Sequence, residues 1–275
     1  MNCAWQEFIS ILPTWIVRET DMQMKESLQE IRLRKDQKVE LICQNEIRYL
    51  ERCVTEDDLN FCINTASRYS PWASESSHQG FLTAPGGHRI GICGDAVIQN
   101  GAMTRIRKIS SLNIRVARDF PGIAESAGKL NGSVLLLGPP GSGKTTLLRD
   151  LIRQISYKQI VSVVDERGEL FPKGIPRGNR TDVLTGCGKA DGITMLLRNM
   201  GPEWIAVDEI TAESDCDALI KCSWCGVKIL ASLHAHSRKD LNNREIYRKL
   251  TAAGIFEYLI ILSRDKSWRL ERMIP

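Results

Sequence analysis

The feature that most constrains this chain is a glycine-rich segment at 138–145, which reads Gly-Pro-Pro-Gly-Ser-Gly-Lys-Thr. The residues before it, 133–137, are mostly apolar, and apolar side chains recur at helical spacing over 145–156 after it. A buried strand, a glycine-rich loop and a helix start, in that order, form a P-loop that holds phosphate with backbone N–H groups. The sequence therefore predicts a site for a nucleoside triphosphate.

Each position of this loop has an expected part in binding ATP. Lys144 is expected to reach the β- and γ-phosphates, and the hydroxyl of Thr145 is expected to ligate Mg²⁺. The residues expected to surround the nucleotide are Gly138, Pro139, Pro140, Gly141, Ser142, Gly143, Lys144, Thr145 and Thr146. ATP and Mg²⁺ are accordingly the predicted ligands.

The composition is that of a soluble globular protein, because 43% of the 275 residues are hydrophobic and 25% are charged. No run of about 18 uncharged apolar residues occurs, and the first residues lack the basic start and apolar core of a secretory signal. A cytosolic protein without a transmembrane segment is therefore predicted. The formal net charge is +4, which gives little support for a nucleic-acid partner.

Two of the nine cysteines, Cys222 and Cys225, have the Cys-x-x-Cys spacing of a metal or redox site. A zinc site would need two more ligands at a matching spacing. A structural role is therefore favoured for both cysteines.

Residues 1–120 are predicted to form an α+β N-terminal domain. The expected elements are a short helix at 5–16, strands at 28–34, 39–43, 47–50, 81–83, 89–94 and 111–117, and a helix at 59–69 after a capping-box pattern at 55–58. The segment Asp-Phe-Pro-Gly at 119–122 interrupts this pattern, which predicts a linker at 118–128.

Residues 128–275 are predicted to form a P-loop ATPase domain, because strands and helices alternate there as in an α/β sheet. The expected strands are 134–137, 160–164, 204–207, 228–233, 258–263 and a terminal strand near 268–273. Helices are expected at 145–156, 194–200 and 215–225.

Paired carboxylates follow one of these strands, because the apolar run at 203–207 ends in Asp208 and Glu209. In a P-loop ATPase, Asp208 would hold Mg²⁺ through water, and Glu209 would orient and deprotonate the attacking water. A second acidic cluster, Asp-Glu-Arg-Gly-Glu at 165–169, ends the strand before it. Since the carboxyl ends of the strands line the ligand crevice of an open α/β sheet, Glu166 is a rival or helper of Glu209.

Two histidines, His234 and His236, follow the strand at 228–233. An imidazole there could hydrogen-bond the γ-phosphate or a carboxylate and so report hydrolysis, and His234 is the expected residue. A metal site is less favoured, because the two histidines alone supply too few ligands.

These motifs together resemble those of the type II and type IV secretion ATPases. The front half sharpens the match to the stage III sporulation protein AA family, which is related to those ATPases. The segments that carry the resemblance are 30–34 (Glu-Ile-Arg-Leu-Arg), 91–94 (Gly-Ile-Cys-Gly), 111–117 (Ser-Leu-Asn-Ile-Arg-Val-Ala), the P-loop at 137–146 and Leu-His-Ala-His-Ser at 233–237. The resemblance runs through nearly the whole chain, from about residue 25 to its end.

The resemblance implies a RecA-like or AAA+-type P-loop domain in a ring-forming motor, a hexamer. It further implies a cytoplasmic protein of the mother cell, peripheral to the membrane, that works with membrane channel proteins of a secretion-like complex in sporulation. In secretion ATPases arginines of the front domain reach the phosphates, and Arg115 and Arg118, with Arg105 and Arg107 nearby, are the matching candidates. Solvated charges on a strand edge are the alternative for all four.

Other functions remain open at this point. A nucleic-acid-binding P-loop ATPase is the first alternative, although the front half is neutral, with 15 basic and 15 acidic residues in 1–120. A small-molecule kinase would need an arginine-rich lid, for which only Arg177 and Arg180 are candidates. A nucleotide-gated ring without turnover is disfavoured because Asp208 and Glu209 are both present.

Overall fold

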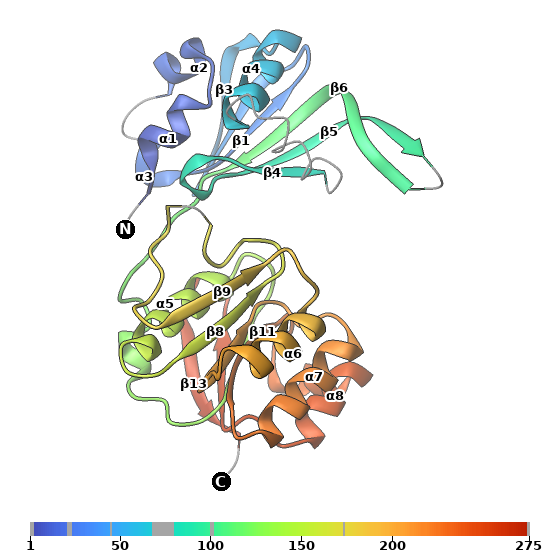
Figure 1. Ribbon diagram of the computed structural model, residues 1–275. Coiled ribbons are helices and arrows are strands. Elements are labelled where there is room, and N and C mark those ends of the chain that lie inside the picture. Colours follow the sequence, from blue (N-terminus) through green and yellow to red (C-terminus); the bar gives the residue numbers. More distant parts are fainter. Residues whose placement is uncertain are drawn as a thin grey trace. The chain divides into compact units, whose positions relative to one another are not determined.

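A computed structural model of the chain describes residues 3–20, 24–44, 46–67, 80–99, 102–172 and 174–273. The chain divides into two compact units (Figure 1). The N-terminal unit is Met1–Asp119 with Pro172–Ile175, and the C-terminal unit is Phe120–Phe171 with Pro176–Pro275. Among the described residues no helix is both long and apolar enough to cross a bilayer.

The N-terminal unit is built on a six-stranded sheet in the order β3-β2-β1-β6-β5-β4 with antiparallel neighbours. The strands are β1 (Leu28–Arg34), β2 (Lys38–Cys43), β3 (Ile47–Cys53), β4 (Phe81–Thr83), β5 (Arg89–Gln99) and β6 (Ala102–Arg115). In the part of this unit that the structure describes, four α-helices precede or interrupt the strands, namely α1 (Trp5–Ser10), α2 (Thr14–Glu19), α3 (Met24–Ser27) and α4 (Glu56–Ala66).

Alternation of apolar and polar residues gives this sheet one buried face. In β2 the side chains of Val39, Leu41 and Cys43 are buried while those between them are more exposed. They join one core with Phe8 of α1 and Leu59 of α4. The strands were therefore predictable from their period of two, which also accounts for the hairpins expected in this part of the chain.

The predicted helix at 5–16 is wrong, because the structure has two helices there, α1 and α2. Pro13 lies immediately before α2, where its missing N–H and fixed φ suit a helix start but would break a helix interior. The capping box at 55–58 is confirmed: the Asp58 N–H donates to Thr55 Oγ1 (3.2 Å) and the Thr55 N–H to Asp58 Oδ2 (2.9 Å). Of the predicted helix at 59–69, residues 68 and 69 lie outside the described residues.

The C-terminal unit is built on a seven-stranded sheet in the order β13-β12-β7-β11-β10-β8-β9. Its strands are β7 (Val134–Leu137), β8 (Val161–Asp165), β9 (Thr181–Thr185), β10 (Trp204–Val207), β11 (Lys228–Leu233), β12 (Tyr258–Leu262) and β13 (Trp268–Arg272). All neighbours are parallel except β12 and β13. The helices are α5 (Lys144–Ser156), α6 (Lys189–Asn199), α7 (Glu213–Trp224) and α8 (Glu245–Ala252).

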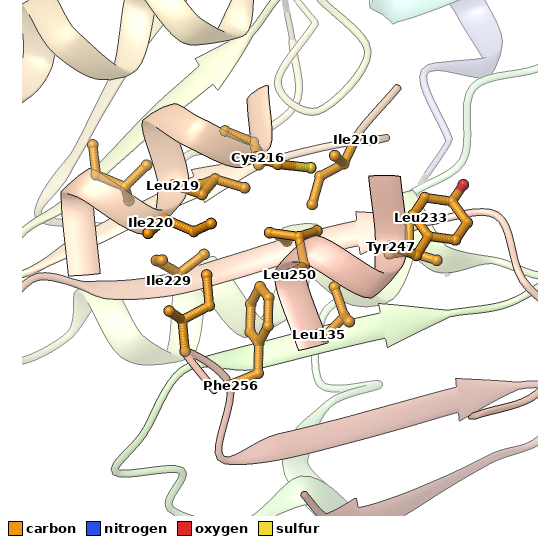
Figure 2. Packing of buried hydrophobic residues seen from close by; sticks show 14 of the residues in the cluster. Leu135, Ile210, Cys216, Leu219, Ile220, Ile229, Leu233, Tyr247, Leu250 and Phe256 are labelled. Carbon is orange, nitrogen blue, oxygen red and sulfur yellow. The ribbon is translucent and has the colours of Figure 1, made fainter. Parts of the chain in front are cut away.

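The core of this unit lies between the sheet and three of its helices. Leu135 of β7 and Ile229 of β11 pack against Leu219 of α7, Leu250 of α8 and Phe256 (Figure 2). β7 and β10 are buried at every position, as strands covered on both faces must be. This explains why continuous apolar runs at 134–137 and 204–207 predicted these strands with the right bounds.

β9 and α8 were not predicted, and the predicted helix at 194–200 begins five residues late, because α6 starts at Lys189. β9 is an edge strand without a fully buried residue, and its sequence, Thr-Asp-Val-Leu-Thr, lacks the apolar run of its neighbours. The start of α6 contains Gly192 and two charged residues, which weaken the local helical pattern.

His88 is fully buried in the N-terminal unit and bridges two backbone segments. The Ala117 N–H donates to His88 Nδ1 (3.0 Å), and His88 Nε2 lies 3.0 Å from the carbonyl oxygen of Ala4. Because Nδ1 accepts, the proton belongs on Nε2, which donates to that carbonyl. Burial lowers the pKa of His88 below its ordinary value of 6.5, since a charged ring is poorly solvated there.

The lowered pKa of His88 predicts acid lability. The unfolded chain binds a proton at this histidine more readily than the folded chain, so the stabilising contribution is present above pH 6.5 and is lost as the pH falls below it. The expected slope is at most about 1.4 kcal/mol per pH unit for one group. Urea unfolding at about pH 7.5 and about pH 5.5 measures it. His88→Gln should flatten the difference, whereas His236→Gln, at an exposed position, should not; an equal slope in both variants would contradict the assignment.

Candidate nucleotide-binding and catalytic site

The parallel sheet brings the predicted site residues to one edge. Leu137, Val164, Val207 and Leu233 lie near the carboxyl ends of β7, β8, β10 and β11, and the cross-strand register places Val207 opposite Val164 and Leu233 opposite Leu137. The segments that follow these ends are the P-loop, the acidic cluster, the paired carboxylates and the histidines. Four segments that are distant in sequence therefore meet at one place, as expected for open α/β sheets.

The P-loop wraps around the ammonium group of Lys144. Lys144 is the first residue of α5 and is 6% exposed, and its Nζ donates to the carbonyl oxygens of Gly138 (2.8 Å) and Pro139 (3.0 Å). Gly141 and Gly143 have φ values of 75° and 95°, which side chains rarely tolerate, so the loop needs glycine there. Burial lowers the pKa of Lys144, and an anion placed beside the ammonium would offset that cost.

Two further observations fit a phosphate at this loop. The hydroxyl of Ser142 is buried and has no hydrogen-bond partner among the described residues, so it is available to a ligand oxygen. A Cβ on Gly138 would press against that hydroxyl and against Leu262, which explains glycine at this position. Thr145 Oγ1 donates to Asp208 Oδ2 (2.7 Å), so the two oxygen groups predicted to hold Mg²⁺ are adjacent.

Ser232 on β11 orients both paired carboxylate residues. Its hydroxyl donates to Asp208 Oδ1 and accepts the backbone N–H of Glu209 (2.9 Å). Glu209 has a φ of 57°, an uncommon conformation for a residue with a Cβ. Conformations of this kind persist where surrounding bonds hold them, and they cluster at functional sites.

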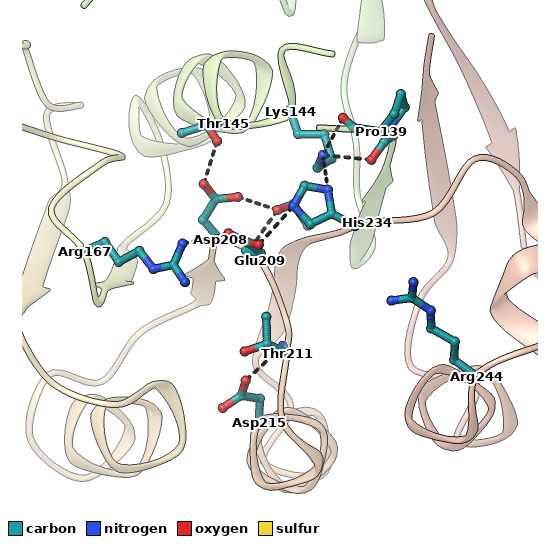
Figure 3. Close-up of polar contacts among 12 residues, drawn as sticks. Pro139, Lys144, Thr145, Arg167, Asp208, Glu209, Thr211, Asp215, His234 and Arg244 are labelled. Carbon is teal, nitrogen blue, oxygen red and sulfur yellow. Dashed lines mark hydrogen bonds and ion pairs between the residues drawn. The ribbon is translucent and has the colours of Figure 1, made fainter. Parts of the chain in front are cut away.

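His234 links the P-loop to Glu209 (Figure 3). Lys144 Nζ lies 3.0 Å from His234 Nδ1, and His234 Nε2 lies 2.9 Å from Glu209 Oε1. An ammonium can only donate, so Nδ1 accepts and the proton on Nε2 is donated to the carboxylate. The other carboxylate oxygen of Glu209 pairs with Arg167 (3.3 Å). Lysine, histidine and glutamate thus form one continuous chain of hydrogen bonds.

The first two carboxylates of the acidic cluster at 165–169, Asp165 and Glu166, make different contacts. Asp165 is buried and accepts backbone N–H groups from Glu169 (2.9 Å), Leu170 (3.0 Å) and Phe171 (3.0 Å), so it fixes the loop. Burial raises the pKa of Asp165. Glu166 instead forms an ion pair with Lys189, in a cavity that Asp208 and Glu209 also line.

The other sequence candidates lie elsewhere. In the N-terminal unit Arg115 pairs with Glu30 (3.0 Å), and Arg118 donates to the carbonyl oxygens of Lys25 and Leu28 (both 2.7 Å). The side chain of His236 is exposed. Cys222 is buried in α7, which raises the pKa of its thiol to about 12, whereas Cys225 is exposed.

Three residues of the site were missed from the sequence. Ser232 lies inside a buried strand, Arg167 is one charge within an acidic cluster, and Lys189 precedes the predicted start of its helix. None belongs to a motif, because each acts through contacts with segments far away in sequence. Only the polar residue in the otherwise apolar run of β11 gave a visible signal, since buried hydroxyls need a partner.

Known proteins resemble this chain over most of its length. A family model described as "Sporulation stage III, protein AA" matches residues 6–270. This chain belongs to that family. The stage III sporulation protein AA of Bacillus subtilis (strain 168) is 39% identical over 258 residues, which cover 87% of this chain and 83% of that protein.

Solved structures of other proteins share the fold of this chain. The pilus retraction motor PilT with bound ADP has a TM-score of 0.63 at 15% identity, covering 94% of this chain and 82% of PilT. The Legionella pneumophila ATPase DotB has a TM-score of 0.58 at 17% identity, covering 95% of this chain and 80% of DotB. The fold is the RecA-like P-loop ATPase fold, as predicted.

Replacement of Ser232 tests how the carboxylates are held. Ser232→Ala leaves Asp208 Oδ1 and the Glu209 N–H without this partner, which should lower the free energy of unfolding by about 1–3 kcal/mol. Ser162 is a matched control, because it is also fully buried, on β8, and its hydroxyl has no partner within the described part of the chain. Ser162→Ala removes an unpartnered buried hydroxyl and so should not lower the free energy of unfolding. Equal losses in urea unfolding would show that Ser232 does not hold the pair.

Proposed function

We propose that this chain hydrolyses ATP to ADP and phosphate and that it works as an oligomeric motor. The observation that carries the proposal is the hydrogen-bonded chain from Lys144 through His234 to Glu209, with Thr145 bonded to Asp208 beside it. A site that only bound nucleotide would not need a carboxylate tied to the phosphate-binding lysine. The fold supports the same function, because of two proteins of similar fold one is named an ATPase and the other a pilus retraction motor with bound ADP.

The residues present suit each part of hydrolysis. The P-loop N–H groups and Lys144 would bind the phosphates, and Glu209 would take a proton from the water that attacks the γ-phosphorus while ADP departs with the bonding electrons. Mg²⁺, held by Thr145 and Asp208, would supply positive charge at the phosphate oxygens. His234 would sense the phosphate, because a ligand that draws Lys144 away also removes the hydrogen bond at Nδ1.

The cellular task that we propose follows from the family. We infer a ring, a hexamer, in the cytoplasm of the mother cell and peripheral to the membrane. There it would energise the channel between mother cell and forespore together with membrane channel proteins of a secretion-like complex. The support is the match of the family model to residues 6–270 together with the similarity in fold to a pilus motor.

Two variants test the ATPase proposal. Lys144→Ala should lose ATP binding, because the ammonium at the loop is removed, whereas Glu209→Gln should bind ATP normally and hydrolyse it at least ~100-fold more slowly. Calorimetry measures binding and phosphate release measures turnover, with exposed Lys158→Ala as the control. Normal binding and turnover in Lys144→Ala would refute the P-loop assignment. Normal turnover in Glu209→Gln alongside its loss in Glu166→Gln would transfer the water-activating role to Glu166.

Arginines of the N-terminal unit are proposed to reach the nucleotide of a neighbouring subunit. Arg115 is the better placed of the two, because its side chain is 58% exposed and its partner is one carboxylate. Arg118 instead donates to two backbone carbonyls, so its replacement would also disturb local structure. Guanidinium suits the task because its planar donors match phosphate oxygens and stay charged.

Supply of an arginine between subunits predicts concentration-dependent turnover. Specific ATPase activity should rise with protein concentration, and Arg115→Ala should lower its plateau at least ~10-fold, since arginines acting in trans carry large rate effects. Arg269→Ala is the matched control, because Arg269 is exposed and pairs with Glu271 on its own strand. Activity independent of concentration, with no effect of Arg115→Ala, would rule out the shared arginine.

A further inference from the structure

A second buried lysine, outside the P-loop, lies beside one of the site carboxylates. Lys189 is the first residue of α6, is 8% exposed and forms an ion pair with Glu166. Its placement is unfavourable on two counts. Burial removes water from the ammonium, and the start of a helix carries partial positive charge. Residues that break local rules in this way are expected at functional sites.

The close approach of α6 to β8 fixes the position of Lys189. A Cβ on Gly192, one turn further along α6, would lie 2.7 Å from Cγ1 of Val164 and 3.0 Å from Sγ of Cys187. Only glycine allows this contact, although in a helix interior it costs about 1 kcal/mol relative to alanine. The start of α6 is therefore held against the end of β8, and Glu166 is the second residue after Val164.

Within the Glu166–Lys189 pair, the carboxylate of Glu166 is the group more exposed toward the site. The cavity here is lined by Val164, Asp165, Glu166, Arg167, Glu169, Lys189, Asp208 and Glu209. The side chain of Glu166 is 41% exposed and that of Lys189 is 8% exposed, so both line the cavity and the carboxylate is the more accessible of the two. Glu209 differs, because His234 and Arg167 each bind one of its oxygens.

We propose that Lys189 is a positioning residue for hydrolysis, which holds the carboxylate of Glu166 in the cavity beside Asp208 and Glu209. Glu166 then accepts a hydrogen bond from the water whose proton Glu209 takes, and so fixes the direction of attack. In this role Lys189 acts through its ion pair with Glu166 and not on the nucleotide directly. The inference rests on the proposed ATPase function and adds the way in which the second carboxylate is held.

Steady-state ATPase kinetics of the full chain test this role. Lys189→Gln removes the charge but keeps a hydrogen-bond donor, and it should lower kcat about 10-fold while KM for ATP changes less than about 2-fold, because Lys189 does not bind substrate. Lys189→Arg, which restores the cation, should return kcat to within about 3-fold of the unchanged protein. Lys221→Gln, at an exposed position of α7, is the matched control.

A double variant separates positioning from a general structural effect. Because Lys189 acts through the charge of Glu166, Lys189→Gln in a Glu166→Gln background should lower kcat no further. Multiplicative losses, or an unchanged kcat in Lys189→Gln alone, would overturn the inference. So would a rise in KM or failure of Lys189→Arg to recover activity, since these indicate lost structure. Absence of ATPase activity in the unchanged protein would refute the proposed function instead.

Discussion

The buried ammonium of Lys144 is the interaction on which the rest of the site depends. Two carbonyl oxygens of the P-loop and one ring nitrogen of His234 solvate it. Each of these acceptors comes from a segment at the same edge of the sheet. The carbonyls therefore fix the loop around the lysine, and the histidine fixes the lysine relative to Glu209. One charge, removed from water, thus connects the P-loop to the paired carboxylates.

Hydrogen-bond partners likewise distinguish the carboxylates of the site from one another. Asp165 receives three backbone N–H groups and fixes the loop, whereas the carboxylate of Asp208 accepts a hydrogen bond from the hydroxyl of Ser232. The carboxylate of Glu209 is bound by His234 and Arg167. Glu166 is held by an ammonium. Carboxylates that look alike in the sequence thus have different hydrogen-bond donors around them. For this reason the sequence alone could not distinguish the role of Glu166 from that of Glu209.

Much of the fold was predictable because local patterns of apolar and polar residues determine it. Continuous apolar runs predicted β7 and β10, and alternation predicted β1 and β2, since burial on two faces or one imposes these periods. The edge strand β9 and the start of α6 at Lys189 were not predictable, because their bounds depend on neighbouring segments. The P-loop and Asp208 were found from motifs. Ser232 and Lys189 were not, because their roles arise only when distant strand ends meet.

The left-handed backbone conformation of Glu209 lowers the stability of the folded protein. A residue with a Cβ held at a φ of 57° costs of order 1–2 kcal/mol, a strain that glycine in the same position would not have. A chain selected for stability alone would accordingly favour glycine after Asp208. If Glu209 acts as proposed, stability and activity trade off at this position, because glycine would relieve the strain and remove the carboxylate.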